Sequence, residues 1–569
     1  MLEEIYRKLC KTENCIILGS DKIREIEYLK NYQNIIQVFT EISLKSGLKD
    51  VVFYIGIPDA HVQLPKIFIK KESYESFKYL PHINNDFSIC IFEDNINYIF
   101  SKKALPDIVE EMISRAKGIL SVYDNPSEGI NEFHREFKAY WGLSYEHQDI
   151  VNEIGLSIIT DKNIPIKGYR FNETLNGFHY LIFQEGELYK KFELYLQFRK
   201  ISYTEIEIFQ IEYSKITPPF SLLFTDSIKL IDERDIIRFR KTINKSGFNS
   251  ALVIFNNING EYFGWIYSRL IPPYDIVKGR RASLSSWQII NDPLFKKSLV
   301  ERISFSNFTP ERLEKRSNGY VHEVKKSICL IGLGSVGSNL LNLILKLPIS
   351  KFHLVDTDIL NVENIYRSQQ GFDKVGLAKV DIAKESIINK NPFCEVTTSK
   401  ESIADILRND NRFLVNYDVS IVVIGNTLIE INILENLIDS ESKNPIILLW
   451  VEPFLASGQM LIVSPLHFRK AKEIIYNFQY SVLNNNDKTK TYLKEGSCQS
   501  GYYPYSEANL TMFLCAAFPY IKSIVKDSAK RESILLTWVG DKDLLQNMEI
   551  ELTEFGNSMN SFQTIITPL

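Results

Sequence analysis

The chain has 569 residues, of which 45% are hydrophobic and 24% charged, and its formal net charge is −4. One hydrophobic core rarely supports a chain of this length, so we expect two or three domains. A slightly acidic chain lacks the overall positive charge of a nucleic-acid-binding protein, and we expect no nucleic acid partner. Seven cysteines without a C-x-x-C pair favour free thiols over a disulfide framework or a structural zinc site.

The beginning of the chain does not resemble an export signal. The stretch MLEEIYRKLC mixes charged and apolar residues, whereas a signal peptide carries a continuous apolar segment. We also expect no membrane partner, because no segment stands out as a membrane span. Together these features predict a cytoplasmic protein.

Residues 1–145 predict a compact α+β domain. The run DVVFYIGIP has the composition of a strand, and apolar residues recur at helical spacing in PDIVEEMISRAKGILSVY and INEFHREFKAYW. Residues 146–320 predict a β-rich linker domain, because FELYLQFRKISYTEIEIFQIEYS and ALVIFNNINGEYFGWIYSR carry aromatic and β-branched residues at near-alternating positions. The polar passage SNFTPERLEKRSNG closes this region.

Residues 321–569 alternate apolar strand-like runs with helical segments. This order predicts a parallel α/β sheet of the Rossmann-like type. The successive runs are SICLIG, SVGSNLLNLILKL, KFHLVD, LAKVDIAKESII, VSIVVIG, LIEINILENLID and PIILLWV.

A glycine-rich loop lies between the first strand and the first helix of this third region. It contains Gly332, Gly334 and Gly337. Backbone N–H groups at the start of a helix suit a phosphate, and Asp356 ends the next strand, where a carboxylate commonly binds ribose. A glycine turn without a ligand and a nicotinamide dehydrogenase both remain alternatives at this point.

Two cations follow the predicted ribose ligand in DTDILNVENIYRSQQGFDKVGLAKVD. They are Arg367 and Lys379. A site that attacks the α-phosphate of ATP must neutralise the charge that builds up as pyrophosphate leaves, whereas a dehydrogenase has no such need. The plainer alternative is that both side chains belong to a solvated surface.

The motif order GxGxxG, D-x-D, N-x-x-R and G-x-x-K resembles the ThiF and ubiquitin-activating (E1) superfamily. The resemblance implies an adenylation domain that uses ATP and Mg²⁺, in which Asp356 binds ribose while Asn364, Arg367 and Lys379 surround the triphosphate. The family usually has a metal-binding aspartate after the next core strand, and this chain has Asn426 there. Asp358 is the candidate replacement, since a carboxylate binds a hard dication better than an amide does.

A thiol that accepts the activated acyl group would sit in LKEGSCQSGYYPYSEANLTMFLCAAFPYI. Cys498 lies in a turn-rich stretch there, and in the resembled enzymes a thiol in this neighbourhood forms a thioester. The alternative is an ordinary loop cysteine. Cys329, Cys394 and Cys515 fall in apolar helix or strand patterns and are expected to be core residues.

The N-terminal region, with IGIPDAHVQLPKIFI and LPHINNDFSICIFED, resembles a ubiquitin-conjugating (E2) fold with Cys90 as nucleophile. Eukaryotic members carry His-Pro-Asn with the Asn eight residues before the cysteine, and here His82 occupies that offset (90 minus 82). His82 would donate a hydrogen bond to the oxyanion or deprotonate the attacking lysine. The alternatives are a buried strand cysteine and a structural turn histidine.

Both domains in one chain resemble the fused E2–E1-type proteins of CBASS antiphage operons. The resemblance implies a relay in which ATP activates the C-terminal carboxylate of a partner protein, Cys498 and then Cys90 carry it as a thioester, and a target lysine accepts it. In such relatives the partner is a cGAS/DncV-like nucleotidyltransferase, and the activating domain forms a homodimer.

Two other functions remain open on the sequence alone. A sulfur-carrier-type adenylyltransferase of the ThiF/MoeB kind explains the nucleotide motif but assigns no task to the first 320 residues. A non-catalytic nucleotide-binding scaffold is compatible with the departures at Asn426 and His82.

Overall fold

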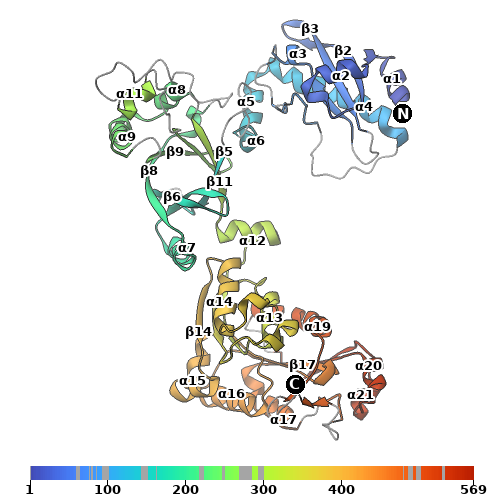
Figure 1. The fold of residues 1–569 in the computed structure, drawn as a ribbon, viewed down its shortest axis with the longest axis vertical. Coiled ribbons are helices and arrows are strands. Elements are labelled where there is room, and N and C mark those ends of the chain that lie inside the picture. Colours follow the sequence, from blue (N-terminus) through green and yellow to red (C-terminus); the bar gives the residue numbers. More distant parts are fainter. Residues whose placement is uncertain are drawn as a thin grey trace. The chain divides into compact units, whose positions relative to one another are not determined.

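The computed structural model describes the chain except for residues 1, 59–63, 76, 78–80, 85, 92–101, 142–151, 162, 217–222, 247–249, 268–284, 292–299, 478–479, 485–490, 495–500 and 528–531. It divides into two compact units, of which the first comprises Met1–Glu185 with Ile201–Thr309 and the second Gly186–Lys200 with Pro310–Leu569. The multidomain α/β and α+β class expected from the sequence is confirmed (Figure 1).

The first unit begins with an antiparallel sheet in the order β1-β2-β3-β4. Its strands are β1 (Asn14–Ile17), β2 (Asn34–Leu44), β3 (Gly47–Ile57) and β4 (Lys66–Ile69), with the short helices α2 (Ser20–Glu25) and α3 (Lys71–Glu75) beside them in the chain. Helices α1 (Leu2–Leu9) and α4 (Leu105–Ser121) share one hydrophobic core with this sheet, because α4 buries the apolar residues that recur along one of its faces. The predicted strand and helix are both present.

A closed β-barrel follows in the same unit, in the order β10-β11-β5-β7-β6-β8-β9. The strands are β5 (Asn152–Ile158), β6 (Ile166–Leu175), β7 (Phe178–Gln184), β8 (Tyr203–Gln210), β9 (Ala251–Asn256), β10 (Tyr262–Ile266) and β11 (Glu301–Asn307). Helices α8 (Phe224–Lys229), α9 (Glu233–Ser246) and α11 (Ser286–Asn291) accompany it. The β-rich character predicted for the middle of the chain is confirmed.

The stretch FELYLQF was expected to be a strand, and this expectation is wrong. It lies in helix α7 (Glu187–Phe198), which buries Tyr189, Phe192, Tyr195 and Leu196. Counted from Tyr189, these positions are i, i+3, i+6 and i+7, which lie on one face of a helix. A strand would instead bury every second residue. Phe192 stacks on Phe393, so α7 belongs to the second unit although it lies between two barrel strands in sequence.

The second unit is built on an eight-stranded sheet in the order β14-β13-β12-β15-β16-β17-β20-β21. The first five of these pair in parallel, and the last three are added antiparallel. The strands are β12 (Lys326–Ile331), β13 (Ile349–Val355), β14 (Glu395–Ser399), β15 (Val419–Val422), β16 (Ile446–Val451), β17 (Ser457–Val463), β20 (Ile534–Val539) and β21 (Thr564–Pro568). A two-stranded ribbon, β18 (Leu493–Lys494) with β19 (Gly501–Tyr502), lies apart from this sheet.

Helices cover both faces of the sheet. Ile328 and Leu330 point into a core shared with α13 (Ser335–Ile344), α14 (Lys379–Lys390) and α19 (Glu507–Lys526). Cys329 and Ile331 point into the opposite core, shared with α15 (Ile403–Asn409), α16 (Thr427–Asp439) and α17 (Phe468–Asn477). Side chains alternate along a strand, so a continuous apolar run such as SICLIG supplies two cores at once. Short helices α12 (Pro310–Asn318), α20 (Lys542–Asn547) and α21 (Glu554–Ser558) complete the unit.

Helix α19 is long and apolar enough to cross a membrane by length and composition, which the sequence reading did not recognise. In this structure its residues Leu510, Phe513, Leu514 and Ala517 are buried in the sheet core.

Candidate functional sites

The glycine loop begins directly after the central strand β12. Gly332 has φ +96°, and a Cβ there would lie 2.6 Å from the carbonyl oxygen of Val423. A Cβ on Gly337 would lie 2.1 Å from the carbonyl oxygen of Gly332, whereas one on Gly334 would meet no atom within 4 Å. Two of the three glycines therefore let the loop and the helix pack closely, and Gly334, at the start of α13, leaves open space for a ligand.

Asp356, directly after β13, is fixed against this loop. Its Oδ2 accepts a hydrogen bond of 2.5 Å from the Leu333 N–H, and its Oδ1 accepts one of 2.8 Å from the Asp358 N–H. Each carboxylate oxygen has a second lone pair. The position therefore suits a ligand hydroxyl group, and ribose binding by Asp356 stays a prediction.

The predicted phosphate-binding residues converge on one pocket of about 100 Å³. Its walls include Gly334, Ser335, Asn364, Arg367 and Lys379. Its volume is below the roughly 300 Å³ at which small-molecule sites begin, so it fits phosphate groups and not a whole nucleotide. A nucleotide held here would extend beyond the pocket.

Each cation in the pocket has a defined setting. The Arg367 guanidinium donates to the Tyr503 carbonyl oxygen at 3.3 Å and lies 5.4 Å from the Tyr505 ring centre. Lys379 Nζ forms an ion pair of 2.8 Å with Asp358. The Asn364 side chain accepts from the Asn361 N–H and so caps the short helix that carries Arg367. Asn364 thus orients the helix and lines the pocket as well.

Asn426 stands where the resemblance predicts a metal-binding aspartate, and its side-chain oxygen already accepts a hydrogen bond. Asn426 Oδ1 accepts from the Ile429 N–H at 3.2 Å and serves as the N-cap of α16. Asp358 keeps 64% of its side chain exposed beside Lys379, which is only 11% exposed. Mg²⁺ commonly binds one or two carboxylates together with substrate phosphates, so Asp358 fits as its protein ligand.

The cysteines divide by exposure. Cys329 and Cys394 are buried, which raises the pKa of both thiols, to about 12 for Cys394. The prediction that these two are core residues is confirmed, but the same prediction for Cys515 is wrong, because Cys515 is exposed on α19. Cys498 lies outside the described residues.

Cys90 is exposed and follows a tight hairpin. The hairpin is closed by a bridge between Ile83 and Ile89 and by a 2.7 Å hydrogen bond from the Cys90 N–H to the His82 carbonyl oxygen. His82 takes φ +64°, a left-handed conformation uncommon outside glycine. The alternative of a buried strand cysteine is excluded, and His82 and Cys90 stand opposite each other across the hairpin.

A groove of about 500 Å³ lies beside this hairpin. It is lined by His82, Cys90, Arg115, Glu128 and Glu132, together with apolar residues of α4 and its C-terminal end. The groove therefore combines a thiol, an imidazole and carboxylates on one surface.

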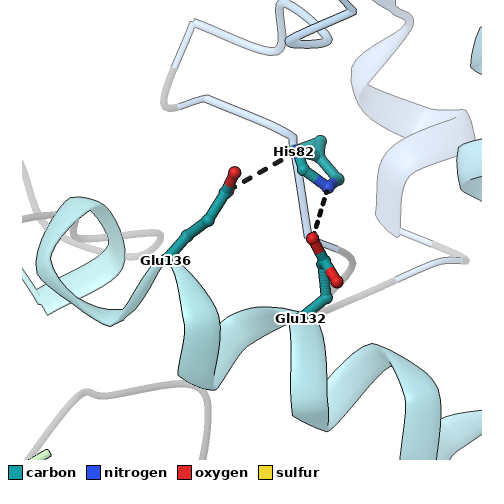
Figure 2. A group of neighbouring side chains, drawn as sticks. All are labelled: His82, Glu132 and Glu136. Atoms are coloured by element: carbon teal, nitrogen blue, oxygen red, sulfur yellow. Dashed lines mark ion pairs between the residues drawn. The ribbon is translucent and has the colours of Figure 1, made fainter. Parts of the chain in front are cut away.

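His82 lies between two glutamates (Figure 2). Its Nε2 is 3.5 Å from Glu132 Oε1 and its Nδ1 is 3.5 Å from Glu136 Oε2. Neither glutamate was predicted from the sequence: Glu132 belongs to helix α5 (Pro126–Arg135), and Glu136 is the residue after it. Glu132, Glu136 and Tyr140 are four residues apart in INEFHREFKAYW, a spacing that would have placed them on one helix face.

Two family matches agree with this arrangement. Residues 316–447 match the ThiF family, and residues 24–150 match prokaryotic E2 family B. The first match includes the whole phosphate pocket except Tyr505. The second includes His82, Cys90, Glu132 and Glu136.

Individual proteins resemble shorter segments. The chain is 35% identical over 85 residues to tRNA threonylcarbamoyladenosine dehydratase of Escherichia coli K12, covering 15% of this chain and 30% of that protein. It is 32% identical over 98 residues to a probable molybdopterin-synthase adenylyltransferase of Porphyra purpurea, covering 17% of this chain and 25% of that protein. It thus spans less than a third of the length of either relative.

The crystal structure of selenomethionine PaaA is 16% identical and covers 43% of this chain and 72% of that chain, with a TM-score of 0.30. A likeness at that level supports no conclusion about function. The two family matches, in contrast, coincide with the two sites that the structure assembles. The chain therefore carries an E1-like ThiF domain and a prokaryotic E2 family B domain.

Proposed function

We propose that this chain activates the C-terminal carboxylate of a partner protein with ATP and conjugates it to a lysine of a target protein. A carboxylate oxygen of the partner attacks the α-phosphorus of ATP, and the bond to the β-phosphate breaks to release pyrophosphate. The Cys498 thiol takes the acyl group from the resulting acyl-adenylate and releases AMP, and the Cys90 thiol then takes it from Cys498, which leaves as its thiol. We propose that the chain acts in the cytoplasm, where ATP and newly made partner proteins are both available.

The observation that carries the first step is the convergence of Gly334, Arg367 and Lys379 on one small pocket. Backbone N–H groups of the loop and two cations surround a space of phosphate size, so negative charge that develops on the leaving pyrophosphate would be stabilised there. Asp358 would hold Mg²⁺, which supplies further positive charge to the phosphates when bound.

The observation that supports the later steps is the exposure of Cys90 beside the groove that contains His82. A thiol must be accessible to accept an acyl group from another thiol. Because both thiols belong to one chain, the transfer between them would be effectively intramolecular.

We further propose that the partner is a cGAS/DncV-like nucleotidyltransferase and that two copies of the chain associate through the activating domain. Exposed apolar side chains in the chain segment that carries the phosphate-binding residues support the second point, since exposed apolar surface often marks an interface. They are Ile359, Val362, Tyr366, Phe372 and Leu377.

The direct test incubates the full chain with ATP, Mg²⁺ and such a nucleotidyltransferase, followed by a non-reducing gel and a pyrophosphate-exchange assay. Cys90→Ala should trap a thiol-sensitive adduct, Cys498→Ala should abolish it, and Cys515→Ala, which also removes an exposed thiol, should behave as wild type. Pyrophosphate exchange without any thiol adduct would contradict the relay.

One second candidate has support from a relative. The similarity to a probable molybdopterin-synthase adenylyltransferase falls in a short segment of the chain, and it favours adenylation without a thioester. This candidate predicts that product formation survives both Cys90→Ala and Cys498→Ala.

A further inference from the structure

Helices α5 and α6 (Phe137–Trp141) have two faces with different partners. Their apolar side chains Phe133, Phe137 and Trp141 belong to one core with residues of β8, β9 and β10. The end of α6 is also held by hydrogen bonds, because the Trp141 indole donates to the Ile303 carbonyl oxygen at 3.1 Å and buried Arg302 donates to the Trp141 carbonyl oxygen at 2.8 Å. Helices α5 and α6 therefore pack against the barrel and share its hydrophobic core.

The other face of the same helices reaches the hairpin that carries Cys90. Glu132 and Glu136 each lie 3.5 Å from a ring nitrogen of His82. The second oxygen of Glu132 pairs with exposed Arg135 at 2.9 Å. Glu136 therefore suits as the acceptor for an N–H at Nδ1, which leaves the Nε2 lone pair to receive a proton on the side of Glu132, the one of these two carboxylates that lines the groove.

Tyr140 connects the two faces. It is 4% exposed and lies in the barrel core, where its ring makes an edge-to-face contact with Phe133, with the ring centres 4.6 Å apart. Its hydroxyl accepts a hydrogen bond from the His82 N–H and donates one of 3.0 Å to Glu136 Oε2. One residue of the barrel core therefore touches the backbone of His82 and one of its carboxylate partners.

We infer that the barrel completes the acceptor side of the Cys90 site, with Glu132, Glu136 and Tyr140 positioning His82 to receive the proton of an incoming lysine. This inference rests on the proposed conjugating role of Cys90 and gives the middle of the chain a task. Glu128 and Glu132 in the groove attract the lysine ammonium.

The ammonium gives one proton to His82 and becomes an amine, and its nitrogen forms a bond to the thioester carbonyl carbon. The carbon–sulfur bond breaks, its electron pair leaves with Cys90 Sγ, and the second proton of the nitrogen passes to that thiolate.

The test bypasses ATP and the partner. The full chain is acylated at Cys90 by thioester exchange with an N-acetylglycine thioester of 2-mercaptoethanesulfonate, using Cys90→Ala to subtract acylation elsewhere. Discharge is then followed with Nα-acetyl-lysine and, in parallel, with hydroxylamine, which is neutral near pH 7 and needs neither an ammonium site nor a base.

Glu132→Gln and Glu136→Gln should slow discharge to lysine about 10- to 100-fold, and Tyr140→Phe several-fold, while discharge to hydroxylamine stays unchanged. Glu110→Gln, on α4 and paired with Lys8, is the matched control and should have no effect. Equal loss with both nucleophiles would show a merely structural role and overturn the inference.

Stoichiometric Zn²⁺ binding that depends on His82, Glu132 and Glu136 would also overturn it, because the three side chains would then form a metal site. The outcome is separable from the proposed function. If acyl-Cys90 discharges as predicted but ATP never loads it, the acceptor site stands and the relay falls.

Discussion

The two candidate sites differ in how their residues are distributed along the chain. Most of the phosphate pocket comes from the stretch between Leu333 and Lys379, and of its described lining residues only Tyr505 comes from a distant part of the chain. The Cys90 site instead joins a hairpin to a helix that begins 36 residues later (126 minus 90) and is anchored in the barrel. The parallel sheet with its glycine loop fixes the first site, whereas packing against the barrel fixes the second.

If the nucleotide site is fixed by its local loop, Gly337→Ala should damage it most. The new Cβ would lie 2.1 Å from a backbone oxygen, so the loop must move. We expect ATP affinity to fall about 100-fold, equivalent to roughly 3 kcal/mol, measured by isothermal titration calorimetry.

Gly334→Ala distinguishes an effect on ATP binding from an effect on stability, because its Cβ meets no protein atom within 4 Å. It should leave the melting temperature unchanged and still weaken ATP binding, since Gly334 lines the phosphate pocket and an added methyl group hinders the close approach of a phosphate to the backbone. Wild-type ATP affinity in Gly337→Ala would contradict a locally fixed site.

If the Cys90 site depends on the barrel, Arg302→Met should separate the two sites. The change leaves the Trp141 carbonyl oxygen without its buried donor, and we expect a loss of about 2 kcal/mol in the free energy of unfolding. Discharge of acyl-Cys90 to lysine should fall while ATP affinity stays unchanged. Arg238→Met, at an exposed position of α9, is the control. Loss of ATP binding in Arg302→Met would break the separation.

Glu430 is a buried carboxyl group in the first turn of α16. Burial raises its pKa from 4.5 to about 7, against the effect of backbone hydrogen bonds from Asn426 and Gly425. Between these two values the unfolded chain releases the proton while the folded chain keeps it, so stability falls as pH rises through that window. Glu430→Gln should therefore be more stable than wild type by about 2 kcal/mol at pH 8, and the difference should vanish near pH 4.5. A pH-independent difference in melting temperature would refute this.

Asn426 gives the smallest expected effect. Asn426→Ala removes the N-cap of α16 and should cost about 1 kcal/mol, whereas Asn426→Asp keeps the cap. Asn426→Asp should also tighten Mg²⁺-dependent ATP binding, because it restores a carboxylate at the position expected from the resemblance. Calorimetry at two Mg²⁺ concentrations checks this, and unchanged affinity would leave Asp358 as the sole protein ligand.

The sequence predicts the nucleotide site more completely than the Cys90 site. Gly332 and Asp356 directly follow two neighbouring parallel strands, so their proximity follows from the parallel sheet, whereas Lys379 was predicted from the motif that it shares with the resembled family. Cys90 and His82 were predicted from a turn motif. Glu132, Glu136 and Tyr140 were not predicted as site residues. The segment that carries them has an apolar face and a polar face, and only the tertiary packing determines which face meets the hairpin.

The strand predicted at FELYLQF failed for a related reason. Aromatic residues at mixed spacing satisfy both a strand and a helix, and the tertiary partner decides between them. The partner here is Phe393, which lies 201 residues further along the chain (393 minus 192).

Helix α7 also determines how this protein can be dissected. The chain passes from one compact unit to the other after Glu185, after Lys200 and after Thr309, so no single cut separates them. A fragment that ends at Thr309 would retain α7 but lack Phe393, the ring on which Phe192 stacks, and the complementary fragment would lack α7. Expression of the two halves therefore requires a short linker in place of residues 186–200 in one fragment and an appended copy of α7 in the other.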